Sequence, residues 1–108
     1  MGFKKLHKQL RKHGFAMYHS NAGKWCYDVD IDVRDDDYLT LLDLPYYKMV
    51  VSYRDAHYEL TCMYMGPDDA CDWSYNPDNA DELLDIIDYE IHDIKAKSKL
   101  TKLYYSKA

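Results

Sequence analysis

The sequence predicts an α+β protein, a two-layer sandwich in which the helices at the two ends of the chain pack on one face of an antiparallel sheet of about four strands. Three observations favour this class. Residues 25–33 alternate apolar and polar side chains with the period of a strand. Residues 46–65 hold two β-branched and aromatic runs around a short turn. Both ends of the chain have apolar residues at helical spacing. The expected order is α-β-β-β-β-α, in one domain over residues 1–108.

The first expected element is a helix over residues 3–13. Phe3, Leu6 and Leu10 form one apolar face, and cations occupy the other faces. Gly14 follows as the expected helix stop, because glycine readily adopts the left-handed conformation that ends many helices. A short apolar and aromatic run and the turn-forming residues 20–23 come next, and no strand is assigned there.

Residues 25–33 give the clearest local signal in the chain. Apolar and polar residues alternate strictly over nine positions, as in a strand that buries one face. One face of the sheet should therefore belong to the core, and the other should carry a row of carboxylates away from the helices. The residues expected in the core are Trp25, Tyr27, Val29, Ile31 and Val33, and those expected on the open face are Asp28, Asp30 and Asp32.

The remaining strands follow an interval, residues 34–45, that the sequence predicts as a loop or a short helical turn. Residues 46–53 and 58–65 are expected to pair as an antiparallel hairpin around the turn 54–57. Residues 72–75 add a short strand.

The last element is expected to be a helix that opens at Asn79, with Glu82 three residues later in a capping-box-like start. It extends as far as residues 103–105. Its apolar stripe is Leu83, Leu84, Ile87, Ile91 and Ile94.

Charge is segregated along the chain, although the formal net charge is only −5. Residues 1–24 carry six cations and no acid, residues 25–94 carry all 19 acids with three cations, and residues 95–108 add five lysines. Most solvated surfaces mix the two signs, so this layout points to charge-based recognition.

The main functional hypothesis is a non-catalytic protein that binds a basic partner surface. Same-face residues of a strand repeat every ~6.6–6.8 Å, so an aspartate row can imitate backbone phosphates. Small inhibitors from phages and other mobile elements, including anti-CRISPR proteins, are an analogy by size and charge. The partner-binding residues would be Asp28, Asp30, Asp32, Asp35, Asp36 and Asp37.

Two alternatives use the basic ends of the chain. A nucleic-acid-binding module would use the terminal helices, against repulsion from the acidic middle segment within a Debye length of ~8–10 Å. A homodimer would join the basic helix of one copy to the acidic face of another. The nucleic-acid-binding residues of the first alternative are Lys4, Lys5, Lys8, Arg11 and Lys12.

A third alternative is a metal-dependent, nuclease-like site on the aspartate strand, because divalent cations need closely spaced carboxylates. An EF-hand is disfavoured, since Val33 and Leu39 stand where that loop needs glycine and glutamate. Residues 59–61 lack the lysine that a restriction-nuclease-type motif would place there.

No other pattern in the chain indicates catalysis. The five histidines are scattered, and no nucleophile elbow, phosphate loop or dinucleotide fingerprint occurs. Three cysteines without metal-ligand spacing favour a reduced, cytoplasmic protein. No apolar run approaches the ~20 residues that cross a bilayer. The sequence thus predicts no catalytic residue, no cofactor, no structural metal and no membrane partner.

Overall fold

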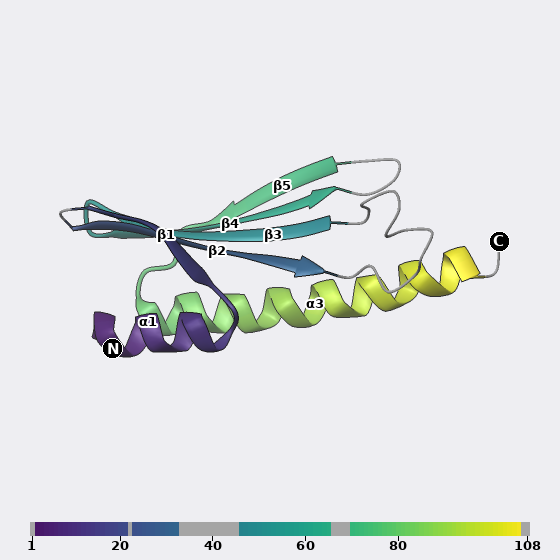
Figure 1. Cartoon of the computed structure of the whole chain (residues 1–108), viewed down its shortest axis with the longest axis horizontal. Helices are drawn as coiled ribbons and strands as arrows, with labels where there is room; N and C mark the ends of the chain where they lie inside the picture. Colours follow the sequence, from purple (N-terminus) through teal and green to yellow (C-terminus); the bar gives the residue numbers. More distant parts are fainter. Residues whose placement is uncertain (1, 22, 33–45, 66–69, 107–108) are drawn as a thin grey trace.

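A computed structural model shows a two-layer α+β sandwich, with the sheet in one layer and two helices in the other (Figure 1). It describes residues 2–21, 23–32, 46–65 and 70–106. The helices α1 and α3 lie along the same face of the sheet, and no helix of the described residues lies over the opposite face. In chain order the elements are α1 (Phe3–Lys12), β1 (Ala16–Asn21), β2 (Lys24–Asp32), β3 (Tyr46–Arg54), β4 (His57–Met65), β5 (Ala70–Tyr75) and α3 (Ala80–Ser106).

The sheet is an antiparallel meander in the order β1-β2-β3-β4-β5. It has five strands where the sequence predicts about four. The additional strand is β1, an edge strand whose six residues are all exposed. With no buried face, β1 lacks the alternation that reveals a strand in the sequence. The predicted hairpin is confirmed, but its turn is only Asp55–Ala56, and β5 begins two residues earlier than the predicted strand.

The core lies between the sheet and the two helices, and the alternation in β2 places its faces correctly. Trp25 and Tyr27 are buried and Val29 is partly buried, whereas Asp28 and Asp30 lie on the open face. The predicted burial of Ile31 and Val33 falls on side chains outside the described part of the chain, as does the predicted segment 34–45. Beside β2, the innermost core residues are Leu6, Leu10, Met49, Val51, Leu60, Cys62, Leu83, Ile87 and Ile94.

Helix α1 ends as its sequence predicts, at a glycine in the left-handed conformation. Gly14 has φ +92°, its N–H donates to the Arg11 carbonyl (2.9 Å), and the Phe15 N–H donates to the Leu10 carbonyl (3.0 Å). These two bonds form a Schellman motif, and the buried Phe15 and Leu10 supply its apolar contact. The chain thereby turns from α1 directly into β1.

Helix α3 has the predicted N-terminal cap, and its first half lies beside α1. The Glu82 N–H donates to Asn79 Oδ1 (2.8 Å), and the Asp78 N–H donates to Glu82 Oε2 (3.4 Å). His13 joins the two helices, since its Nε2 lies 2.6 Å from Asp88 Oδ1 while its Nδ1 lies 2.8 Å from the Gln9 carbonyl. Both ring nitrogens face oxygen atoms, and these two contacts tie the end of α1 to α3.

Candidate functional site on the open sheet face

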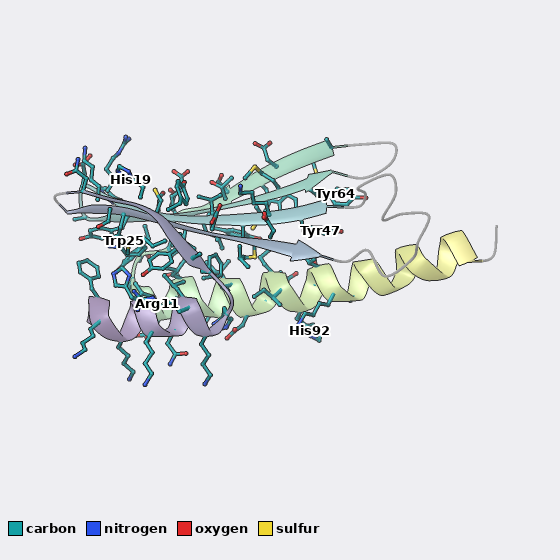
Figure 2. All side chains as sticks on the ribbon, viewed as in Figure 1. Arg11, His19, Trp25, Tyr47, Tyr64 and His92 are labelled. Carbon is teal, nitrogen blue, oxygen red and sulfur yellow. The ribbon has the colours of Figure 1, made fainter. Side chains whose placement is uncertain are left out.

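The open face of the sheet is polar, and its two ends carry different sets of side chains. At the end where the hairpins β1–β2 and β3–β4 turn, the register brings His19, Cys26, Ser52 and Glu59 abreast on four strands. At the opposite end, Asp30, Lys48, Met63 and Asp72 are abreast on β2 to β5. In Figure 2, His19 projects from this open face, whereas Trp25 points toward α1.

The predicted aspartate row is only partly described, and Asp28 pairs with a lysine of β3. Asp28 Oδ2 lies 3.3 Å from Lys48 Nζ, and both side chains are about one-third exposed. Asp30 is exposed on the same strand. The side chain of Asp32 and the residues Asp35, Asp36 and Asp37 lie outside the described part of the chain. Sequence reasoning missed Asp72, which the meander brings to the same end of the face.

The alternative set of cations lies on the outer surface of α1. All five side chains are exposed, and Figure 2 shows the nitrogen-tipped side chains of α1 pointing away from the sheet. The first turn of α1 contains no acidic residue. Lys4 and Lys5 lie in this first turn, close to the positive end of the helix dipole, where a cation is destabilising. Burial, and then the charge of Arg11, lower the pKa of His7 on the neighbouring face of α1.

A hollow of about 590 Å³ opens on the sheet face at the hairpin end. Its floor includes Cys26, Val50, Ser52 and Thr61, and it is flanked by Tyr18. The sequence gives no sign of this feature, because its lining comes from β1 to β4 and from the segment after β5.

Two irregularities of the backbone shape the hollow. The β1–β2 register shifts between Met17 and His19, so Tyr18 is an additional residue and both Tyr18 and His19 line the hollow. The β3–β4 turn has Asp55 at φ +53° and Ala56 at φ +62°. A two-residue type I′ turn needs positive φ at both central positions, which glycine and asparagine adopt more easily than alanine.

Replacing Ala56 with glycine is expected to raise the free energy of unfolding by about 0.5–1 kcal/mol. Relief of the left-handed strain exceeds the larger backbone entropy that glycine loses on folding. The matched control is Ala96→Gly, an exposed alanine inside α3, which should lower the same free energy by about 1 kcal/mol. Urea denaturation of the three proteins measures both effects. A lower free energy of unfolding for Ala56→Gly than for the parent would show that the Ala56 backbone is not strained.

A second feature that sequence reasoning missed is a buried carboxylate under the sheet. Glu90 of α3 is 2% exposed, and its Oε1 accepts hydrogen bonds from Trp73 Nε1 (3.2 Å) and from the Tyr75 hydroxyl. Glu90 Oε2 is buried without a partner among the described residues. A signal was present, because residue 90 continues the stripe formed by Leu83, Ile87 and Ile94.

Glu90 contributes to the raised pKa values of two neighbouring side chains, Tyr75 and Cys62. Its hydrogen bond, followed by burial and by its charge, raises the pKa of Tyr75 to about 12. Burial, and then the Glu90 charge, raise the pKa of the Cys62 thiol to about 12. Cys62 is therefore a protonated thiol at neutral pH and a poor nucleophile. Cys26, Cys62 and Cys71 are free thiols.

Within the described residues no group of three or more histidine, cysteine, aspartate or glutamate side chains is arranged to hold a metal ion. The chain matches no protein-family model, and neither a curated protein nor a solved structure matches it. No helix in the described part of the chain is both long and apolar enough to span a bilayer.

Proposed function

We propose that this chain is a non-catalytic binding protein that engages a basic protein surface through the carboxylate-bearing end of its open sheet face. The observation that carries the proposal is this uncovered face, on which β2 and β5 present aspartates and no described helix intervenes. The partner would be a nucleic-acid-binding protein whose phosphate-binding surface the aspartates occupy. That role corresponds to an inhibitor of the phage anti-defence or anti-CRISPR type.

Geometry supports the proposal in two ways. Asp28 and Asp30 project from one strand at the ~6.6–6.8 Å interval of same-face residues. The pair between Asp28 and Lys48 is a partly exposed surface ion pair, the kind that contributes about 0–1 kcal/mol. A partner arginine or lysine can therefore replace Lys48 at little cost in free energy.

The test is capture of a partner from the source organism, followed by affinity measurement at two salt concentrations. The double variant Asp28→Asn, Asp30→Asn should bind the captured partner about tenfold more weakly, with a shallower salt dependence, because rigid carboxylates steer and hold a basic surface. The control variant Asp81→Asn, Asp85→Asn removes the same charge from exposed positions of α3. It should change the affinity less than twofold.

Three outcomes would contradict the proposal. Equal affinity of the open-face variant and the parent would remove this face from binding. Retention of nucleic acid that is lost when Lys4, Lys5 and Lys8 become glutamine would assign binding to α1. Mg²⁺- or Mn²⁺-dependent cleavage of nucleic acid that disappears in the open-face variant would indicate a metal site.

A further inference from the structure

The hollow at the hairpin end of the open face has the dimensions of a small-molecule site. Its volume of about 590 Å³ falls within the ~300–1,000 Å³ typical of ligand pockets. It lies on adjacent strands of the sheet, so the central strands fix its floor. Asp30 and Asp72 lie toward the other end of the face, whereas Asp28 is in register with Val50 at the edge of the hollow. The inference below does not rest on the proposed protein interface.

The backbone around the hollow is strained in a way that the fold alone does not require. An ordinary Asn-Gly or Asp-Gly turn would join β3 to β4 without a left-handed alanine. Instead, Asp55 and Ala56 hold left-handed conformations, and a bulge in β1 adds Tyr18 to the lining. Such outliers persist mainly where a site needs them, and bulges often redirect a side chain beside a binding site.

The mouth of the hollow carries two permanent cations, one from each hairpin, and one carboxylate, that of Asp55 beside Arg54. Lys24 begins β2 next to the first turn, and Arg54 ends β3 next to the second. His19 and His57 also line the hollow and can donate hydrogen bonds from their ring N–H groups. In the described part of the chain, the acid that Arg54 contacts is Asp55, whose Oδ2 lies 3.8 Å from Arg54 Nε. Within the described residues its two terminal nitrogens are therefore available for a bidentate contact.

The floor of the hollow offers groups suited to hydroxyls. Glu59 Oε1 accepts a hydrogen bond from Thr61 Oγ1 (3.3 Å), and Thr61 Oγ1 lies 3.2 Å from Ser74 Oγ. The Ser52 hydroxyl is beside Glu59 in the strand register. Tyr18 flanks this floor, and its hydrogen bond with the Cys26 thiol, followed by burial, raises the pKa of its phenol.

The two ends of the hollow thus select opposite features of a ligand. A guanidinium fork and an ammonium bind the oxygens of a phosphate monoester well. The carboxylate of Glu59 repels a second anionic group but accepts hydrogen bonds from hydroxyls. This combination disfavours a continuous polyanion such as nucleic acid and favours a molecule with one charged end.

We infer that the hollow binds a small organic phosphate, with the phosphate between Lys24 and Arg54 and a hydroxyl-bearing body over Ser52, Glu59 and Thr61. The ligand class is a sugar monophosphate or a nucleoside monophosphate, which share these two features.

The experiment is titration of the ¹⁵N-labelled chain with ribose 5-phosphate, AMP, ribose and inorganic phosphate, followed by amide chemical shifts. Ribose 5-phosphate or AMP should give saturable shifts centred on β2, β3 and β4 around the hollow. Their affinity should exceed that of inorganic phosphate and of ribose by about tenfold or more, because both ends of the ligand contribute hydrogen bonds.

Variants of the mouth residues distinguish a specific phosphate site from nonspecific attraction of phosphate to exposed cations. Arg54→Gln should weaken binding of the organic phosphate about tenfold or more, and Arg54→Lys should recover only part of it, because lysine lacks the fork. Arg11→Gln removes an exposed cation from α1 and should leave the affinity unchanged. The Arg54 side chain is 72% exposed, so its replacement should not impair folding, which the spectrum itself reports.

Several results would overturn the inference. One is the absence of saturable shifts with both organic phosphates. Another is equal affinity for inorganic phosphate and ribose 5-phosphate, the sign of an adventitious ion only. A third is equal weakening by Arg11→Gln and Arg54→Gln. The proposed protein interface would be untouched by any of these results, because its test uses Asp28 and Asp30.

Discussion

Replacing Glu90 with alanine is expected to lower the free energy of unfolding by about 3 kcal/mol. The substitution removes the acceptor of two hydrogen bonds, from Trp73 Nε1 and the Tyr75 hydroxyl, at a position that is 2% exposed. Hydrogen bonds to a charged group contribute about 1.5–3 kcal/mol each, and part of that loss is recovered when the partly buried donors reach water. Urea denaturation of the variant and the parent measures the difference.

Glutamine at position 90 is the matched control, because it keeps an acceptor oxygen of the same reach. Glu90→Gln should stay within about 1 kcal/mol of the parent, since removal of a buried charge offsets the weaker hydrogen bonds to a neutral oxygen. An alanine variant as stable as the glutamine variant would show that these hydrogen bonds do not stabilise the fold.

The same pair of proteins gives a pH test. Tyr75 ionises near pH 12 in the folded chain and near pH 10 when unfolded. The raised folded pKa stabilises the protein below pH 10, and this contribution is lost as the pH rises from 10 to 12. In Glu90→Gln the hydrogen bond to a carboxylate, the largest cause of the raised pKa, becomes a bond to a neutral amide oxygen, and the carboxylate charge is absent. The Tyr75 titration, followed by phenolate absorbance, should therefore move down toward pH 10.

Replacing Val51 with aspartate is expected to unfold the protein or to lower the free energy of unfolding by at least about 4 kcal/mol. Val51 is 0% exposed in the centre of the core layer of β3. An aspartate there is buried without a partner or must be neutralised, and both cost several kcal/mol. Circular dichroism and urea denaturation measure the loss.

The neighbouring valine provides a control of the same residue type. Val50 lies on the open face, where its cross-strand neighbour is Asp28, so Val50→Asp should cost only about 1 kcal/mol from like-charge repulsion. The sign of the difference tests the assignment of faces in β3. Greater damage from Val50→Asp than from Val51→Asp would mean that the strand has the opposite face toward the helices.

The candidate sites differ in how far the sequence could predict them. Asp28 and Asp30 were placed correctly on the open face, because a period of two fixes the face of every residue once one side is buried. The cations of α1 were likewise readable from helical spacing. Asp72 and the hollow could not be predicted, since both depend on which strands lie side by side. Glu90 was visible as an acid in an apolar stripe, but its partners Trp73 and Tyr75 were not.

Local sequence patterns were sufficient to predict the elements whose pattern matches their burial. Strict alternation defined β2, the Asn79 and Glu82 pair defined the start of α3, and Gly14 defined the end of α1. Two features required the three-dimensional structure: that residues 16–21 form a strand, β1, and that Val51 rather than Val50 of β3 faces the core. β1 is exposed along its whole length, and β3 carries apolar residues at adjacent positions, so neither has a periodic signal. Their places are fixed by hydrogen bonds to neighbouring strands and by packing against α1 and α3, which no local window of sequence contains.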